Sequence, residues 1–250
     1  MKKDYLNEVL NEKNGKRYEN GKIIESYMHE KYHVLRLQLA FELLKQSICD
    51  SFPVLDNAHI QMLEIAGSTG YMSGRLLKEG YSVLLTDLES APLELAVQRN
   101  PELRTMAMDA SGIFPFKDCT FHAIYAGDII EHLFDTSLFL SECYRCLKPE
   151  GVLVLTTPNL ASIGDRINFL FGISPRQVNP THEFLCLHIR PFTYRKLKEV
   201  LSDTGFGDFH VTSNLIRINI GHFKKDFYYL AKKCPTLGRS LIVAAFAHKE

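Results

Sequence analysis

The stretch that most constrains the fold of this chain runs from residue 59 to residue 89. An apolar run at residues 60–65 ends in small residues at 66–70, and a helical stretch precedes a second apolar run at 81–86. The second run ends in Asp87. The order of strand, small-residue turn, helix and strand is typical of a parallel βαβ unit, in which both strands end at the same edge of a sheet.

The turn at residues 66–70 has the residue types that a ligand-binding turn needs. Where a strand turns sharply into a helix, a Cβ obstructs the approach of a ligand to the backbone, and the helix N-terminus offers free N–H groups. Asp87 lies 17 positions after Gly70, at the tip of the neighbouring strand. A carboxylate there is placed to accept hydrogen bonds from both hydroxyls of a ribose, so the unit predicts a nucleotide-binding crevice.

The alternation of strands and helices continues along the chain and predicts the fold class. Further helices are expected at 91–99, 135–147 and 194–204, and further strands at 103–108, 121–127, 152–157, 209–213 and 241–248. Strands that alternate with helices and repeatedly end in an acidic or small residue indicate a parallel sheet with its site along one edge. We therefore expect an α/β fold with a doubly wound, mostly parallel, seven-stranded sheet.

An N-terminal extension is expected ahead of the first strand. Apolar positions recur at helical spacing from Ile23 to Ile48, which predicts one long or two shorter amphipathic helices. We interpret residues 1–55 as a helical extension and residues 56–250 as the main domain. The extension either closes over the crevice as a lid or covers one face of the sheet, and the sequence favours neither role.

Composition narrows the choice of partner and compartment. Lysine plus arginine and aspartate plus glutamate number 29 each, so net charge does not favour a nucleic-acid partner. The start of the chain lacks the apolar core of a secretory signal, and no later run is long enough to span a bilayer. The six cysteines lie mostly in apolar contexts, which is typical of reduced thiols. These features predict a cytoplasmic protein without a transmembrane segment; they do not indicate its oligomeric state.

Five segments together resemble the class I S-adenosylmethionine-dependent methyltransferases. They are LEIAGSTG (63–70), TDLE (86–89), MDASGIFPF (108–116), FHAIYAGDIIEHL (121–133) and LKPEGVLVLTTPN (147–159). The resemblance implies a Rossmann-like methyltransferase fold and S-adenosylmethionine as the methyl donor. It also implies a set of cofactor-binding residues, which comprises Glu64 near the methionine amino group, Ala66, Gly67, Ser68 and Gly70 in the turn, Asp87 at the ribose and Leu88 next to it in the chain, Asp109 and Ala110 at the adenine, and Asp128 and Ile129 beside the sulfonium and the acceptor.

The turn departs from the pattern of this family at two positions. Family members usually have glycine where this chain has Ala66 and Ser68, and only the last of the three glycines is kept, as Gly70. Serine is tolerated there only if its backbone angle is an ordinary one. This departure motivates an alternative, in which the chain is a non-catalytic module that binds S-adenosylmethionine.

A second pattern follows the fourth strand and concerns the chemistry. Asp128, Glu131 and His132 form a D-x-x-E-H motif, and His188 lies in the later segment HIRPFT. These oxygen and imidazole ligands would hold Mg²⁺ or another divalent cation with open positions for a chelating substrate. The motif is similar to the E-x-x-E-H arrangement of the ubiquinone-biosynthesis O-methyltransferases and of the small-RNA 2'-O-methyltransferases. The alternative is a metal-free site in which His132 acts as general base, because an imidazole titrates near neutral pH.

The sequence favours a small-molecule acceptor over the other classes. We expect an O-methyltransferase in which Glu131, His132 and His188 are catalytic and the acceptor is a sugar, a polyol or a phenolic natural product. The variable segments 160–192 and 214–240 are expected to determine which acceptor binds. A 2'-O-type RNA-modifying enzyme is the second hypothesis; it predicts a basic face or an added domain, and the balanced charge argues against it.

Overall fold

The computed structural model describes residues 31–179, 187–220 and 223–249. The chain comprises two compact units, residues 1–35 and residues 36–250, and the larger unit contains the sheet. Helix α3 (Lys31–Ser51) begins in the smaller unit, and most of its length belongs to the larger one. Residues 1–30 of the predicted extension lie outside the described residues, so its role as a lid or a cover stays a prediction.

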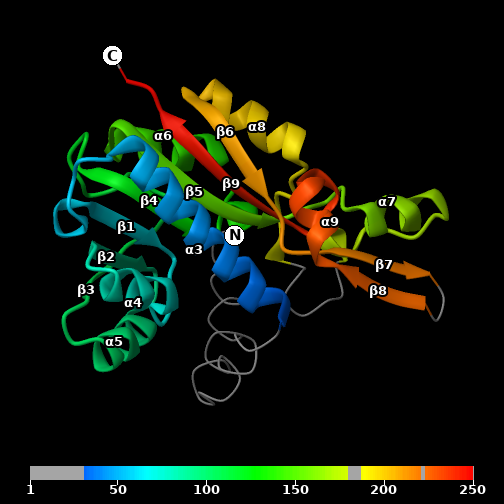
Figure 1. Cartoon of the computed structure of the whole chain (residues 1–250), viewed down its shortest axis with the longest axis horizontal. Helices are drawn as coiled ribbons and strands as arrows, with labels where there is room; N and C mark the ends of the chain where they lie inside the picture. Colours follow the sequence, from blue (N-terminus) through cyan, green and yellow to red (C-terminus); the bar gives the residue numbers. More distant parts are fainter. Residues whose placement is uncertain (1–30, 180–186, 221–222, 250) are drawn as a thin grey trace, which may run out of the picture. The chain divides into compact units, whose positions relative to one another are not determined.

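The larger unit has the predicted seven-stranded sheet, in which the first five strands in spatial order are parallel (Figure 1). The last strand along the chain, β9, lies antiparallel between β5 and β6. In spatial order the strands are β3 (Arg104–Ala107), β2 (Ser82–Asp87), β1 (Gln61–Ile65), β4 (Phe121–Gly127), β5 (Leu147–Pro158), β9 (Ser240–Ala247) and β6 (Phe206–Thr212). The chain order reverses between β1 and β4, which is where open α/β sheets form a ligand crevice.

Helices connect most of the parallel strands, as crossover connections usually do. Helix α4 (Tyr71–Lys78) joins β1 to β2, α5 (Ser90–Arg99) joins β2 to β3, and α6 (Thr136–Cys146) joins β4 to β5, whereas β3 runs to β4 without a helix. Helices α7 (Ile163–Leu170) and α8 (Tyr194–Asp203) lie between β5 and β6, and α9 (Tyr228–Lys233) precedes β9. The short 3₁₀ turns are η1 (Asn57–His59), η2 (Ile130–His132), η3 (Arg176–Val178) and η5 (Pro235–Leu237). The central strands are buried along nearly their whole length, because helices cover both faces of the sheet. Their apolar runs therefore do not alternate with polar residues.

The register of the parallel strands brings their carboxyl ends to one edge. Ile65, the last residue of β1, is paired with Thr86 of β2 and Ala126 of β4. Asp87 is paired with Ala107 at the end of β3. The turn after β1 and the residues that follow β2, β3 and β4 consequently share this edge, as expected from the sequence.

The two segments predicted as insertions form structure of their own after β5 and β6. The first contains α7 and η3. The second contains a two-stranded antiparallel hairpin, β7 (Ile216–Ile220) and β8 (Phe223–Phe227), followed by α9. The hairpin was not expected from the sequence. In the part of the chain that the structure describes, no helix is long and apolar enough to cross a membrane.

Candidate functional site

The turn after β1 has the backbone of a glycine-rich turn although two of its residues carry a Cβ. The φ angles are 54° at Ala66, 51° at Ser68 and 70° at Gly70. The left-handed region costs a residue with a Cβ roughly 1–2 kcal/mol. The ordinary angle that a serine prefers is therefore not adopted at Ser68. The turn keeps its shape at the expense of local strain, which is the kind of strain that occurs at ligand sites.

Gly67 is required for a different reason, which is space. A Cβ at this position would lie 2.4 Å from the Glu64 carboxyl carbon and 2.4 Å from a methyl group of Leu85. Both neighbours are buried, so neither can move away cheaply. The middle of the turn therefore packs directly on the end of β1.

Asp87 at the end of β2 is bonded to this turn. Its Oδ2 accepts a hydrogen bond of 2.8 Å from the Ser68 N–H, and its Oδ1 accepts one of 3.1 Å from the Glu89 N–H. Burial raises the pKa of the carboxyl above its ordinary value, although these N–H donors oppose the shift. An ionised carboxylate accepts about four hydrogen bonds, so Asp87 keeps lone pairs for a ligand.

Glu64, expected near the amino group of the cofactor, caps the start of α4 in this structure. Its Oε2 accepts hydrogen bonds from the Ser73 N–H, at 2.7 Å, and from the Ser73 hydroxyl. Burial raises the pKa of Glu64 from 4.5 to about 7, against the effect of these two donors. A cation placed beside this carboxyl would favour the ionised form.

The raised pKa of Glu64 predicts a pH-dependent stability. The native state holds this proton more tightly than the unfolded chain, so the free energy of unfolding falls as pH rises from about 4.5 to about 7. Across this range the free energy of unfolding of the wild type should fall by roughly 2–4 kcal/mol. In Glu64→Gln this decrease should be absent when both proteins are measured by urea denaturation. The exposed Glu102→Gln should leave the wild-type slope unchanged; equal slopes in all three proteins would contradict the assignment.

The segments after β2 and β3 supply the residues predicted for the ribose and adenine. Leu88 is 56% exposed beside Asp87, whereas Ala110 is buried. Asp109 Oδ1 accepts hydrogen bonds from the Ser111 N–H at 2.8 Å and from the Ser111 hydroxyl at 2.7 Å, which orders the loop. The structure therefore offers an apolar surface and carboxylates at this edge.

Asp128 is used differently from what the motif predicted. Its carboxylate forms an ion pair with Arg36 of α3, whose side chain is buried. The Thr156 hydroxyl donates to Asp128 Oδ1 at 2.7 Å, and Arg36 Nη1 donates to the same hydroxyl at 2.8 Å. Asp128 itself has a left-handed backbone, with φ of 50°. The carboxylate is thus committed to a structural network and does not join the other three residues of the predicted metal set.

Those other three residues do meet. One ligand atom from each of Glu131, His132 and His188 lies within 4.8 Å of the others, and the centres of the two imidazole rings are 4.9 Å apart. His132 Nδ1 donates to the Leu187 carbonyl at 3.0 Å, and His188 Nδ1 donates to Gln177 Oε1 at 3.1 Å. Both partners are acceptors, so in the neutral rings Nε2 carries the lone pair.

Glu131 is the buried member of this group. Its side chain is 1% exposed, and neither carboxyl oxygen forms a hydrogen bond of normal geometry with the residues that the structure describes, although the Thr157 hydroxyl is close enough to lower its pKa. Burial raises its pKa well above the ordinary range, and the nearby Asp128 carboxylate adds to the shift. A buried carboxyl without a donor is costly, and such groups usually serve a ligand, a proton or an ion. Ile129, which precedes this turn, is only partly buried.

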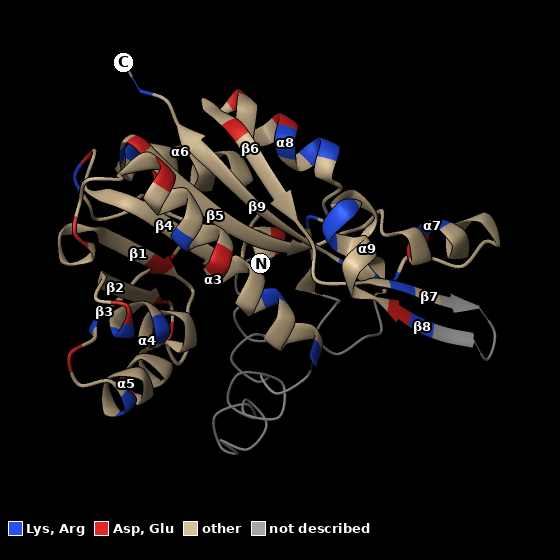
Figure 2. Ribbon diagram, viewed as in Figure 1, with Lys and Arg blue, Asp and Glu red and all other residues tan. Residues whose placement is uncertain are grey.

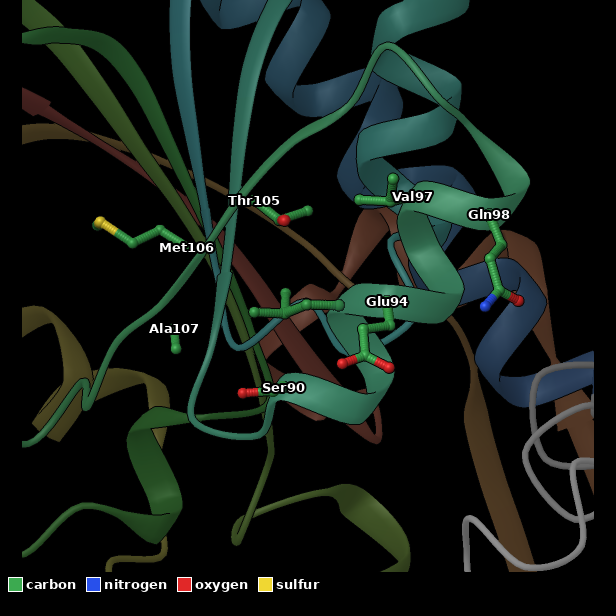
Figure 3. Close-up of a pocket in the computed structure, with 8 residues that line it drawn as sticks. Ser90, Glu94, Val97, Gln98, Thr105, Met106 and Ala107 are labelled. Atoms are coloured by element: carbon green, nitrogen blue, oxygen red, sulfur yellow. The ribbon is translucent and has the colours of Figure 1, made fainter.

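A hollow of about 420 Å³ lies away from this group, between α5 and the outer strand β3 (Figure 3). It is lined by Ser90, Leu93, Glu94, Val97, Gln98, Thr105, Met106 and Ala107. None of the predicted cofactor or catalytic residues lines it. We therefore do not assign the candidate site to this hollow.

Three residues of this region escaped the sequence analysis, namely Arg36, Thr156 and Gln177. Arg36 had a detectable signal: it interrupts an apolar helical stretch, Val34 to Phe41, without an acidic residue three or four positions away. A cation in that setting usually has a distant partner. Thr156 and Gln177 carried no such signal, because hydroxyl and amide side chains are common at all positions.

Comparison with known proteins agrees with this arrangement. A family profile described as a methyltransferase domain matches residues 63–155. A probable S-adenosylmethionine-dependent methyltransferase of Mycolicibacterium smegmatis is 29% identical over 145 residues, which are 58% of this chain and 51% of the relative. The mitochondrial ubiquinone biosynthesis O-methyltransferase of Bos taurus is 23% identical over 187 residues, 68% of this chain and 48% of that protein. The chain thus spans about half the length of these relatives.

A solved structure shows the same fold over nearly the whole chain. An S-adenosylmethionine-dependent methyltransferase from Thermotoga maritima superposes with a TM-score of 0.59 at 17% identity, covering 92% of this chain and 97% of that one. Residues 63–155 thus match a methyltransferase-domain family, and the chain has the fold of the class I S-adenosylmethionine-dependent methyltransferases.

Proposed function

We propose that this chain transfers a methyl group from S-adenosylmethionine to a hydroxyl of a small molecule, such as a sugar, a polyol or a phenolic compound. The observation that carries the proposal is the meeting of Glu131, His132 and His188 beyond the carboxyl end of β4. This strand is the neighbour of β1, and the turn after β1 is the segment predicted to hold the cofactor. Proton removal and cofactor binding would therefore take place at one edge of the sheet. A cytoplasmic location stays a prediction from the sequence.

The residues around the turn fit the donor group by group. Asp87 would accept the ribose hydroxyls, Leu88 would cover one face of the adenine, and Asp109 would face its amino group. Glu64 would lie nearest to the positively charged amino group of the methionine. When bound, the cofactor supplies an electrophilic methyl group on a sulfonium. The protein has then to align the acceptor with that methyl group and to exclude water.

Asp87→Ala should weaken S-adenosylmethionine binding by about 1–3 kcal/mol, which is roughly 5-fold to 150-fold in Kd. The substitution removes both the predicted ribose hydrogen bonds and the bond that orients the Ser68 N–H. Asp87→Asn, which keeps one acceptor oxygen, should have a smaller effect. Isothermal titration calorimetry measures both, with Glu102→Ala as the exposed control. An unchanged Kd in Asp87→Ala would show that the ribose binds elsewhere.

His132 would act as the general base for a hydroxyl acceptor. The bond from Nδ1 to the Leu187 carbonyl fixes the tautomer in which Nε2 accepts a proton. His188 and Glu131 lie close enough to bind the acceptor or to stabilise the imidazolium that results. An imidazole that titrates near neutral pH suits removal of a proton from a phenolic hydroxyl.

The same three residues also fit a divalent cation, which is the alternative for this site. Their ligand atoms converge, and both imidazoles donate Nδ1–H to an oxygen, as metal-bound histidines usually do. The Glu131 carboxyl oxygens form no hydrogen bond of normal geometry with the described residues. Two imidazoles and one carboxylate suit Mn²⁺, Fe²⁺ or Zn²⁺ better than Mg²⁺, which prefers oxygen ligands. A bound cation would lower the pKa of a chelated acceptor hydroxyl.

Calorimetric titration with MnCl₂, ZnCl₂ and MgCl₂ tests the cation directly, without an acceptor. We expect binding of Mn²⁺ or Zn²⁺ in the wild type, little binding of Mg²⁺, and loss of binding in Glu131→Gln. Glu102→Gln should bind as the wild type does. If the wild type binds none of the three cations, the residues serve as base and acceptor contacts only.

The decisive experiment for the function is a methyl-transfer screen with methyl-labelled S-adenosylmethionine over hydroxylated sugars, polyols and phenols, with and without chelator. Transfer to oxygen in one of these classes supports the proposal. Transfer only to nitrogen, to carbon or to RNA would show that the proposed acceptor class is wrong. Failure to bind the donor even at millimolar concentration would contradict the enzyme itself.

A further inference from the structure

The end of helix α7 exposes a set of large apolar side chains. Phe169, Leu170, Phe171 and Ile173 are 68%, 83%, 77% and 56% exposed, and α7 has no buried residue. We call these four residues the apolar tip. Single exposed apolar residues are normal on a soluble protein, but three in a row with a fourth nearby mark an interaction surface.

The apolar tip has a defined conformation. The Ile173 N–H donates to the Asn168 carbonyl at 3.0 Å, and the Gly172 N–H donates to the Phe169 carbonyl at 3.0 Å. Gly172 has a φ of 72°, so these bonds form a Schellman motif that ends the helix. The backbone therefore presents the apolar side chains outward in a fixed arrangement, and little conformational entropy is lost when they contact a partner.

The segments around the apolar tip are basic in a chain whose charges balance overall. Residues 160–179 and 215–239 together contain eight lysines and arginines but only two aspartates. Both aspartates are occupied within the protein: Asp226 pairs with Arg217, and Asp165 accepts from the Ser162 hydroxyl and the Arg176 N–H. The charge available to a partner at this end of the larger unit is therefore positive.

These basic residues lie on elements that pack together. A Cβ at Gly164 of α7 would lie 2.7 Å from the Arg217 carbonyl oxygen of β7, so helix and hairpin are in direct contact. Lys225 on β8 and Lys232 and Lys233 on α9 are exposed. Figure 2 shows lysines and arginines along β7, β8 and α9, and Figure 1 shows α7 and the hairpin extending beyond the carboxyl end of β5.

We propose that this surface docks the protein on an anionic lipid bilayer, with the apolar tip in the headgroup and acyl boundary and the lysines over the phosphates. Apolar side chains ringed by basic ones are typical of interfacial membrane anchors. A second copy of the chain is a poorer occupant, because a symmetric contact would bring two positive surfaces together. RNA would be attracted by the lysines but would leave Leu170 and Ile173 without a partner.

The docking surface is linked to the candidate site along the chain. Gln177, four residues after Ile173, is buried and accepts the hydrogen bond that orients His188. A bilayer bound at the apolar tip would therefore lie next to the segment that positions a catalytic candidate. The docking itself does not depend on methyl transfer, and it is tested without an acceptor.

The test is flotation of the full chain with two kinds of vesicle, phosphatidylcholine alone and phosphatidylcholine mixed with phosphatidylglycerol. We expect binding to the mixed vesicles, weaker binding to the neutral ones, and weaker binding at high salt. Combining Phe169→Ser, Leu170→Ser and Phe171→Ser should lower the affinity for mixed vesicles at least about tenfold. Combining Lys232→Glu and Lys233→Glu should lower it about tenfold and weaken the salt dependence.

Matched controls come from the opposite edge of the sheet. Val54 is 92% exposed and precedes β1, and Lys117 is exposed and precedes β4. The variants Val54→Ser and Lys117→Glu should bind vesicles as the wild type does. Each variant is checked for an unchanged Tm. Equal binding of the wild type to neutral and anionic vesicles, or wild-type binding by the serine variant, overturns the proposal. So does a serine variant that changes only self-association or only RNA binding.

Discussion

His132→Ala is expected to lower kcat by about 10²-fold to 10⁴-fold while the Kd for S-adenosylmethionine stays unchanged. The imidazole lies beyond the end of β4, and its Nδ1–H is held by the Leu187 carbonyl, so Nε2 is the atom that would take a proton. The Leu187 carbonyl that this bond engages lies outside the turn that is predicted to hold the cofactor. The measurement is steady-state kinetics with the acceptor found in the screen, together with calorimetry of cofactor binding.

The companion variant His188→Ala separates the two mechanisms proposed for this site. If the residues hold a cation, His132→Ala, His188→Ala and Glu131→Gln should all lose both activity and cation binding, because each removes a ligand. If His132 is a base alone, His188→Ala should be milder and a residual rate should rise with pH. His210→Ala, at an exposed position on β6, is the control for loss of an imidazole. Turnover unaffected by His132→Ala would remove this residue from the mechanism.

Arg36→Met is expected to lower the free energy of unfolding by about 2–4 kcal/mol. The substitution leaves the Asp128 carboxylate largely buried without its cation, and it removes the hydrogen bond that Arg36 donates to Thr156. The cost lies in the unpaired charge rather than in lost packing, since methionine fills most of the same volume. Urea denaturation of the purified variant measures it, with Arg195→Met at an exposed position of α8 as the control.

The double variant Arg36→Met with Asp128→Asn tests this explanation. Because the second substitution neutralises the stranded carboxylate, we expect the double variant to regain at least half of the stability lost in Arg36→Met. If the two losses simply add, the ion pair does not govern stability. We also expect the double variant to bind Mn²⁺ or Zn²⁺ as the wild type does, because Asp128 does not lie with Glu131, His132 and His188.

Much of the fold was predictable because it depends on local patterns. The apolar runs gave the strands and the helical spacing gave the connecting helices, with boundaries that differ from the observed ones by only a few residues at most elements. The strand at 152–157 proved to be the core of the longer β5, Leu147–Pro158. The hairpin β7–β8 was missed, since the alternation in Ile216–Ile220 is short and its stability depends on α7 packed against it.

The site was predictable where it depends on the ends of strands. Parallel strands end at one edge, so the turn, Asp87, Asp109 and the D-x-x-E-H motif had to gather there. The pairing of Asp128 was not predictable, because its partner Arg36 is 92 positions earlier and no spacing rule connects them. The same is true of Gln177 and His188, whose bond depends on how the segment after α7 folds back.

By itself, the sequence determined the α/β class, the order of the strands along the chain and the edge of the sheet at which the predicted cofactor and catalytic residues gather. Those features follow from periodicity and turn chemistry, which act between residues close in the chain. Only the tertiary structure decided that Asp128 pairs with Arg36, that Gln177 bonds to His188, and that Phe169, Leu170 and Phe171 face solvent. Burial and long-range hydrogen bonds belong to the packed chain, so no local pattern specifies them in advance.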